Sequence, residues 1–402
     1  MKKILFYLPF IKVGGIERVS IEYLSGLIEK GYKVDLIIDF DMGKEGNTFE
    51  YAIPKEVSFQ YIKSEKISSF IYYFRTLGKK NKIFNLFLYA FMIFFDFCYY
   101  HTKVKRVLNK EKYDYTMSAY QFLPSYLTGF KSAKHFIWLH GSVENFFTGI
   151  LRLLIKSYGK KLDKYDGIIT TAYEMKEQLE SFYPQLPKNK INMIYNPFDF
   201  DMIIKKSNEY DNLIDSDKEL INKNYICTVC RLDEHQKDIT TLILAYNKLV
   251  LETGHRDLLY IIGDGPSEID LKNLVKEYKL EDRIYFLGVK TNPDVWIKHS
   301  KLFVLSTKFE GLPTVLIETM ALDTFIISSD CKTGPKEILN SGECGDLFPV
   351  GDIDVLFSCM HNALSDSEYI SRKIINAKVR SKDFSSEVII KKLLLLFKDE
   401  EN

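Results

Sequence analysis

Two glutamates and two basic residues in the second half of the chain are the side chains best suited to chemistry. Glu310 and Glu318 frame the segment Phe309–Ala321, and Arg231 and Lys237 follow an apolar run typical of a strand. Two cations at the carboxyl end of a strand suit a diphosphate. An acid inside the following helix suits the hydroxyls of a ribose. Together these residues predict a site for a diphosphate with a ribose beside it.

The segment around Glu310 also predicts an anion site made by the backbone. Strand Leu302–Leu305 precedes it, so Glu310 lies on a loop at the carboxyl edge, where open α/β sheets bind ligands. Pro313 fits the first turn of a helix that continues over Thr314–Leu322. The free N–H groups of Thr314 and Val315 would then face an anion, and the helix dipole would favour its negative charge.

The elements that must position these residues form an alternating pattern. Strand-like apolar runs alternate with helical patterns, which indicates parallel sheets with helices on both faces. Helices are expected at Ile16–Lys30 and Ser385–Phe397. Strands are expected at Lys3–Pro9, Lys33–Asp39, His135–Leu139, Gly167–Thr170, Ile191–Tyr195, Ile226–Cys230, Leu258–Ile262, Ile284–Phe286, Leu302–Leu305 and Phe325–Ser328.

A polar, acidic stretch interrupts this pattern, which then restarts. We therefore expect two doubly wound halves: an N-terminal domain over residues 1–196 and a C-terminal domain over 224–382. Residues 197–223 are expected to link them, and 383–402 to form a final helix. A chain of 402 residues is long enough for two such cores.

Charge and aromatic residues are unevenly distributed. The chain holds 55 Lys and Arg against 54 Asp and Glu, which argues against a nucleic-acid-binding protein. Residues 63–110, however, hold ten basic residues against two acids, Glu65 and Asp96, and residues 83–100 are almost wholly apolar and aromatic. Two interpretations remain open: a helix lying on an anionic membrane surface, or a core helix with basic loops.

Neither the cysteines nor the paired aspartates predict a metal site. Six scattered cysteines do not form a disulfide framework, and free thiols indicate a reducing, cytoplasmic location. Cys227 and Cys230 lie in a strand-like run, where positions three apart point to opposite faces. The Asp-x-Asp pairs at 39–41, 199–201 and 352–354 are unconnected, so we interpret them as solvated loops.

The ordered motifs resemble the retaining GT-B glycosyltransferases of family 4, also called glycosyl transferases group 1, of bacterial type. The matching pieces are GGIERV (Gly14–Val19), NPFD (Asn196–Asp199), RLDEHQK (Arg231–Lys237), IIGDGP (Ile261–Pro266), IYFLG (Ile284–Gly288) and FEGLPTVLIETMA (Phe309–Ala321). The resemblance implies an α/β GT-B fold, in which two doubly wound Rossmann-like domains face a cleft and the final helix crosses back to the first domain.

The resemblance also implies an activity and a set of site residues. Such enzymes transfer a sugar from a nucleotide diphosphate sugar, here expected to be a UDP-sugar, with retention and without a metal or other cofactor. The residues that would hold the donor are Gly15, Arg231, Lys237, Val289, Glu310, Gly311, Leu312, Pro313, Thr314 and Glu318. Those expected to act on the reacting groups are Arg231, Lys237, Glu310 and His140, while Lys290 would lie near the base.

Partners and alternatives follow from the same resemblance. The expected acceptor is a saccharide or a lipid-linked saccharide of bacterial surface polysaccharide or lipooligosaccharide synthesis. The expected location is the inner face of the cell membrane, with residues 63–110 in peripheral contact.

Two alternative functions are a nucleotide-sugar 2-epimerase of the same architecture and a non-catalytic nucleotide-sugar-binding subunit. The charges at Arg231, Lys237, Glu310 and Glu318 favour the transferase.

Overall fold

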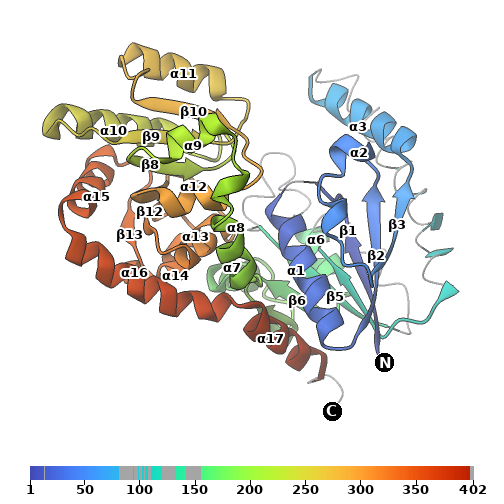
Figure 1. The fold of residues 1–402 in the computed structure, drawn as a ribbon. Coiled ribbons are helices and arrows are strands. Elements are labelled where there is room, and N and C mark those ends of the chain that lie inside the picture. Colours follow the sequence, from blue (N-terminus) through green and yellow to red (C-terminus); the bar gives the residue numbers. More distant parts are fainter. Residues whose placement is uncertain are drawn as a thin grey trace. The chain divides into compact units, whose positions relative to one another are not determined.

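The computed structural model consists of two compact units, shown in Figure 1. The structure describes residues 1–12, 14–80, 94, 98, 102–103, 105–106, 110–119, 133–141 and 155–398. The first unit comprises residues 1–171, 176–197 and 390–402, and the second comprises 172–175 and 198–389. The expected membrane-facing helix at 83–100 therefore falls almost wholly outside the described residues.

The first unit is built on a parallel sheet in the order β3-β2-β1-β4-β5-β6-β7. Its strands are β1 (Lys3–Leu8), β2 (Lys33–Phe40), β3 (Ser58–Lys63), β4 (Tyr115–Ser118), β5 (Lys134–Leu139), β6 (Gly167–Thr170) and β7 (Ile191–Met193). The helices that begin in this half of the chain are α1 (Gly15–Glu29), α2 (Gly43–Gly46), α3 (Glu65–Lys80), α6 (Ile155–Leu162) and α7 (Tyr173–Phe182).

The second unit is built on a parallel sheet in the order β10-β9-β8-β11-β12-β13. Its strands are β8 (Tyr225–Val229), β9 (Leu258–Ile262), β10 (Ile284–Gly288), β11 (Leu302–Leu305), β12 (Phe325–Ser329) and β13 (Asp346–Phe348). The remaining helices are α8 (Phe200–Ser207), α9 (Asp215–Ile221), α10 (Ile239–Thr253), α11 (Glu268–Glu277), α12 (Pro293–His299), α13 (Thr314–Ala321), α14 (Pro335–Ile338), α15 (Ile353–Ser365), α16 (Ser367–Ser381) and α17 (Ser386–Lys398).

Both sheets are doubly wound, which confirms the expected fold class. In each sheet, the second and third strands lie successively on one side of the first strand, and the strands that follow lie on its other side. The order reverses between β1 and β4 in the first sheet and between β8 and β11 in the second. Ligands bind outside the carboxyl ends of the strands at such a switch point. The loops after β8 and β11 are therefore the places where a ligand is expected.

The last helix packs onto the first unit through its second half. Phe397 stacks on Tyr115 of β4, with ring centroids 4.3 Å apart. On α1, Gly26 lies so close to Ile390 that a Cβ at position 26 would stand 2.5 Å from Ile390 Cγ1. These contacts explain why residues 390–402 group with the first unit rather than with the second.

All ten expected strands are present, and their ends either agree or are shifted by one or two residues. The expected strand at Ile191–Tyr195 stops at Met193, and its last contact with β6 is the hydrogen bond from the N–H of Ile194 to the carbonyl of Thr170. Three strands, β3, β4 and β13, were not expected. None of the helices in the described residues is both long enough and apolar enough to span a bilayer.

Candidate active site

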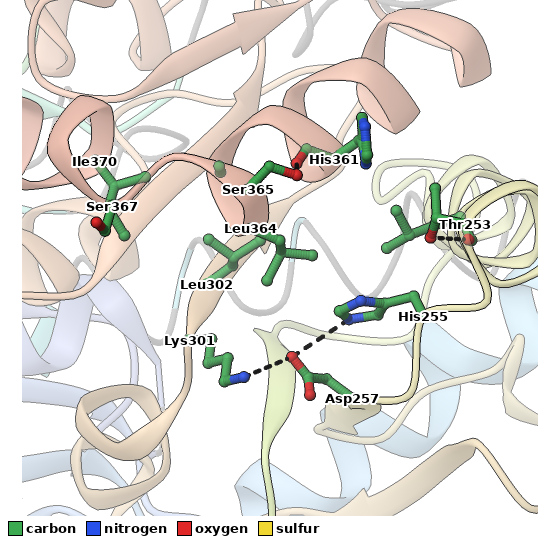
Figure 2. Close-up of a pocket in the computed structure, with 12 residues that line it drawn as sticks. Thr253, His255, Asp257, Lys301, Leu302, His361, Leu364, Ser365, Ser367 and Ile370 are labelled. Atoms are coloured by element: carbon green, nitrogen blue, oxygen red, sulfur yellow. Dashed lines mark hydrogen bonds and ion pairs between the residues drawn. The ribbon is translucent and has the colours of Figure 1, made fainter.

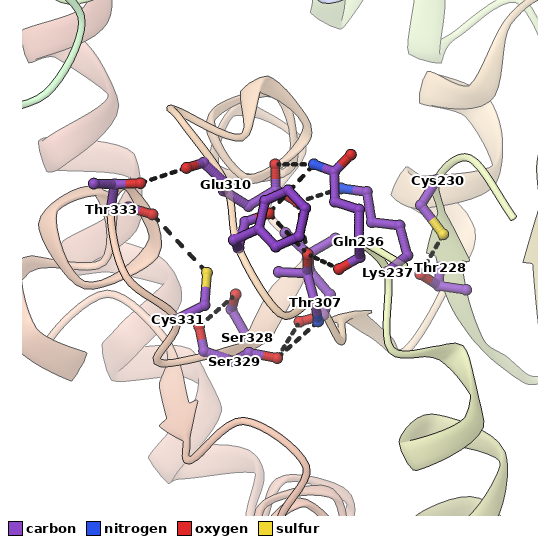
Figure 3. Close-up of polar contacts among 12 residues, drawn as sticks. Thr228, Cys230, Gln236, Lys237, Thr307, Glu310, Ser328, Ser329, Cys331 and Thr333 are labelled. Atoms are coloured by element: carbon purple, nitrogen blue, oxygen red, sulfur yellow. Dashed lines mark hydrogen bonds and ion pairs between the residues drawn. The ribbon is translucent and has the colours of Figure 1, made fainter. Parts of the chain in front are cut away.

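Two loops of the second unit are joined at the switch point by backbone contacts. Lys237 and Thr307 form an antiparallel bridge. The N–H of Lys308 donates to the carbonyl of Gln236 at 2.8 Å, and that of Asp238 donates to the carbonyl of Ser306 at 3.0 Å. The loop after β8 is thereby held against the loop after β11, as Figure 3 shows. Residues more than 70 positions apart in the sequence meet here through this pairing.

The Glu310 carboxylate is the centre of a dense polar network. Its Oε1 accepts from the Lys237 ammonium, and the Thr307 hydroxyl lies 2.9 Å from the same oxygen. Oε2 lies 3.4 Å from the amide nitrogen of Gln236, and the Glu310 carbonyl accepts from the Thr333 hydroxyl. Only 9% of the Glu310 side chain and 13% of the Lys237 side chain are exposed. The two side chains that the sequence singled out are therefore in direct contact and mostly buried.

Lys237 remains charged in this environment. Burial lowers the pKa of its ammonium, while the carboxylate of Glu310 raises it. The net pKa lies above the usual value for lysine. Lys237 therefore carries a full positive charge at neutral pH, as the binding of a diphosphate requires.

Arg231 and Asp238 flank the pair without entering the network. Arg231 directly follows the loop residue Cys230, its side chain is 70% exposed, and its Nε lies 3.9 Å from Asp233. It is thus free to reach a ligand from solvent. Asp238 is an acid next to the proposed diphosphate site, but its carboxylate accepts from the Thr241 hydroxyl at 2.8 Å in the first turn of α10. This hydrogen bond engages the carboxylate within its own helix.

The segment from Gly311 to Thr314 forms the amino end of α13. Pro313 is the residue before the helix rather than part of its first turn, with ψ of 102°. The helix begins at Thr314, so the amides of Thr314 and Val315 have no intrahelical acceptors and can bind an anion, whereas the N–H of Leu316 donates to the carbonyl of Pro313. Leu312 is buried beneath this turn. Gly334, with φ of 92°, approaches the carbonyl of Gly311 so closely that a Cβ would stand 2.6 Å from it.

Glu318 and Val289 belong to α13 and to the loop after β10, respectively. Glu318 lies inside α13 and is buried. Val289 follows Gly288 at the carboxyl end of β10 and is 58% exposed. The neighbouring Lys290 donates to both carboxylate oxygens of Asp217 on α9, at 2.7 and 2.8 Å. The Lys290 charge is therefore engaged by α9, whereas the exposed side chain of Val289 is accessible to a ligand.

In the first unit, Gly15 and His140 lie at the carboxyl edge of the sheet. Gly15 begins α1 after β1, and His140 follows β5. The His140 ring stacks on Trp138, with centroids 5.6 Å apart, and burial lowers its pKa to about 4. At neutral pH His140 is thus an uncharged imidazole, which can exchange hydrogen bonds with sugar hydroxyls but does not provide positive charge.

The pKa of His140 predicts a pH dependence of stability. An unfolded histidine titrates near 6.5. The unfolded chain therefore binds a proton that the folded chain does not bind until about pH 4. The free energy of unfolding is expected to fall by about 2 kcal/mol between pH 7 and 5 on account of His140. Urea unfolding of wild type and His140→Gln at both pH values checks this. An equal pH slope in the two proteins would contradict it.

A cavity of about 640 Å³ in the second unit, shown in Figure 2, lies away from these residues. Asp257 and Lys301, which line it, come just before β9 and β11, so the cavity is at the amino edge of the sheet. Lys301 Nζ and His255 Nε2 lie 3.0 and 3.3 Å from Asp257 Oδ2. Its charged groups neutralise one another at the edge opposite the switch-point loops, so we assign it no part in the site.

The paired aspartates and the thiols have structural explanations. Asp199 and Asp352 each accept from the backbone N–H three residues on, at 2.9 Å, and so cap α8 and α15. Two of the three Asp-x-Asp pairs are therefore helix starts, and in the third Asp39 lies on β2, fully buried and paired with Lys63, so the prediction of solvated loops was wrong. Burial raises the pKa of the Cys227 thiol to about 12 and that of Cys230 to about 11, so both are protonated at neutral pH.

Three members of the network were missed in the sequence: Gln236, Thr307 and Thr333. All three lie in loops that follow strands at the carboxyl edge, but their hydrogen bonds join different loops. Gln236 and Thr307 meet across 71 positions, and Thr333 meets Glu310 across 23. A polar residue in a loop after an apolar strand was the available signal, and it does not reveal the partner.

Two Rossmann-like units, with a lysine–glutamate pair at a switch point, define the GT-B class of two-domain transferases. The Glycosyltransferase Family 4 profile matches residues 13–202, and the Glycosyl transferases group 1 profile matches residues 211–380. An uncharacterized glycosyltransferase of Methanocaldococcus jannaschii is 30% identical over 300 residues, covering 66% of this chain and 72% of the relative. The chain belongs to this glycosyltransferase family, with the family 4 and group 1 regions in its two halves.

Two further relatives have more informative names. An N-acetylgalactosamine-N,N'-diacetylbacillosaminyl-diphospho-undecaprenol 4-alpha-N-acetylgalactosaminyltransferase of Campylobacter jejuni is 29% identical, covering 58% of this chain and 60% of that enzyme. The crystal structure of Anabaena HepE in complex with UDP-glucose has a TM-score of 0.73 at 18% identity, covering 99% of this chain and all of that one. At this identity the structural likeness supports the GT-B fold.

Proposed function

We propose that this protein transfers a sugar from a UDP-sugar to a lipid-linked saccharide, with retention of the anomeric configuration and without a metal ion. The observation that supports this most directly is the buried Lys237–Glu310 pair at the β8–β11 switch point, beside the amino end of α13. It combines a diphosphate-binding cation with a sugar-binding carboxylate. No feature of the described residues favours the 2-epimerase alternative.

The proposed roles follow the charges. Lys237, Arg231 and the amides at Thr314 would bind the diphosphate, Glu318 the ribose, and Glu310 the donor sugar. The bond from the anomeric carbon to the diphosphate oxygen breaks with its electron pair left on that oxygen. The acceptor hydroxyl oxygen bonds to the carbon, and its proton leaves with the diphosphate. Fixed cations stabilise the developing charge.

The remaining donor residues have smaller proposed roles. Gly311, Leu312 and Pro313 would shape the turn that presents the α13 amides, and Val289 would contact the base. Gly15 and His140 are proposed to contact the phosphates and the sugar through the carboxyl edge of the first sheet. These roles rest on the family pattern and on the position of each residue at a strand end.

The proposal is tested with purified full-length protein and a panel of UDP- and GDP-sugars. Thermal shift is expected to identify one UDP-sugar that stabilises the protein by a few kcal/mol at about 100 times its Kd. Release of UDP on addition of an undecaprenyl-diphosphate saccharide is expected to continue in EDTA, and NMR of the product should show the anomeric configuration of the donor. Binding without turnover of any donor, or an inverted product, would contradict the proposal.

The Campylobacter relative acts on a diphospho-undecaprenol-linked saccharide, which supports a membrane-bound acceptor for this chain. We propose that residues 63–110 contact anionic lipid on the cytoplasmic side. Lys63, the first residue of this segment, ends β3 and is fully buried, so the contact would begin with α3, where Phe70 and Tyr73 are 51% and 60% exposed. Exposed rings beside basic residues suit a membrane interface.

Vesicle flotation tests this contact. The protein is expected to float with vesicles containing anionic lipid and to remain in solution with neutral vesicles. Five charges are to be removed together by alanine substitution of Lys79, Lys80, Lys103, Lys105 and Arg106. Each basic residue near an anionic membrane surface contributes about 1 kcal/mol to the free energy of membrane binding, so flotation of this variant is expected to be lost. Substitution of exposed lysines on α11 and its end, Lys276 and Lys279, is the control. Undiminished flotation of the fivefold variant would overturn the membrane contact.

A further inference from the structure

We propose that Thr307 is a positioning residue that orients the Glu310 carboxylate, so that its Oε2 oxygen is presented to the hydroxyl groups of the donor sugar. The inference rests on the proposed function, because it assigns a task to a residue that supports the sugar-binding carboxylate. Thr307 itself is fully buried.

The Thr307 hydroxyl has one proton and three neighbouring acceptors. Its Oγ1 lies 2.9 Å from Glu310 Oε1, 3.1 Å from the Gln236 carbonyl and 3.4 Å from the Phe309 carbonyl. The carboxylate oxygen is both the nearest and the only charged one of these three acceptors. Hydrogen bonds to an ionised acceptor are about twice as strong as neutral ones. The proton therefore points to Glu310.

The backbone of Thr307 is held rigidly enough to transmit this orientation. Its N–H donates to the Ser329 hydroxyl at 2.8 Å on β12, and it forms the bridge with Lys237. The Glu310 carbonyl is held separately by the Thr333 hydroxyl. Both ends of the short loop are thus fixed to neighbouring strands and loops, and the carboxylate cannot turn without breaking the Thr307 contact.

The two carboxylate oxygens are consequently unequal. Oε1 accepts from both Lys237 and Thr307. Oε2 has one contact among the described residues, with Gln236 Nε2 at 3.4 Å, which is a weak hydrogen bond at most. Oε2 therefore retains the lone pairs needed to accept from sugar hydroxyls, while Oε1 is used for orientation. Without the Thr307 hydroxyl, Lys237 alone would hold Glu310, and the ammonium imposes little direction because it is a point charge on a flexible stem.

Thr307→Val tests this directly, because valine has nearly the shape of threonine but lacks the hydroxyl. Loss of this hydrogen bond to a charged group is expected to lower kcat/KM for the UDP-sugar roughly 10- to 100-fold. The affinity for UDP alone, measured by calorimetry, is expected to change less than about threefold, since UDP lacks the sugar that Glu310 binds. Thr307→Ser, which keeps the hydroxyl, is expected to restore turnover.

Three outcomes would overturn the inference: wild-type turnover in Thr307→Val, no rescue by Thr307→Ser, or an equal loss of UDP affinity, which would indicate a purely structural role. If Thr307→Val does not fold, Ser329→Ala serves instead, because it releases the Thr307 N–H while leaving the loop sequence intact. It is expected to reduce turnover in the same direction with unchanged UDP affinity, and unchanged turnover would count against the inference. A wild-type protein that turns over no sugar nucleotide would contradict the proposed function itself.

Discussion

Replacing Lys237 with alanine is expected to lower donor turnover on the order of 10³-fold, the size of effect seen when a preorganised charge-stabilising donor is removed. The ammonium is buried, ion-paired and has a raised pKa, so it is a fixed positive charge rather than a mobile surface one. The measurement is UDP release per enzyme at saturating donor and acceptor.

The matched control is Lys308→Ala in the neighbouring loop. The Lys308 ammonium donates to the Glu234 carbonyl and its side chain is 40% exposed, outside the Glu310 network. Turnover within about threefold of wild type is expected for it. A Lys237→Arg variant keeps the charge but not the compact ammonium shape, so only partial rescue is expected. Comparable activities in Lys237→Ala and Lys308→Ala would refute the assigned role.

Loss of stability must be separated from loss of chemistry in the Lys237 variant. Removing the lysine leaves the Glu310 carboxylate buried without its cation, which destabilises a protein by about 3 kcal/mol or more. The double variant Lys237→Met with Glu310→Gln removes both charges and is expected to recover most of the melting temperature. It is not expected to recover turnover. Recovery of both would mean that the single variant failed through unfolding alone.

The sequence predicts the class of fold and the positions of the charged site residues because both depend on local patterns. Strand runs such as Leu258–Ile262 and Leu302–Leu305 are continuous and apolar, as strands buried on both faces must be, and their ends agree with the structure. Arg231, Lys237 and Glu310 follow such runs, so their place at the carboxyl edge could be inferred before their spatial order was known.

What the sequence does not predict depends on short elements and long-range pairing. The strand β3 reads Ser-Phe-Gln-Tyr-Ile-Lys, and its first half is exposed at the sheet edge, so it has no apolar run. The strand β13 has three residues and exists because Ile327–Ser329 of β12 offers it partners. Likewise, the Thr307 contacts depend on how the loops after β8 and β11 pair, and single-loop patterns do not specify that pairing.

Replacing Glu310 with glutamine is expected to separate sugar transfer from nucleotide binding. Glutamine keeps the shape of the side chain and can still accept from Thr307, but it removes the charge that binds Lys237 and the donor hydroxyls. Turnover is expected to fall roughly 10²- to 10³-fold. UDP is expected to bind at least as tightly as to wild type, because the Lys237 ammonium no longer has to exchange a carboxylate for the diphosphate.

The control for Glu310→Gln is Glu277→Gln, which removes an exposed acid from α11 and is expected to leave both turnover and UDP affinity unchanged.

The Glu310→Gln variant also tests the electrostatics of the Lys237–Glu310 pair. Since the Glu310 carboxylate raises the pKa of Lys237, the pKa of that ammonium is expected to fall in Glu310→Gln, and UDP affinity should then weaken at a lower alkaline pH than in wild type. A Glu310→Gln enzyme with full turnover would remove the carboxylate from the reaction. A parallel loss of UDP affinity and turnover would instead assign Glu310 to holding the loops after β8 and β11 together, because that is the other task its contacts with Lys237 and Thr307 perform.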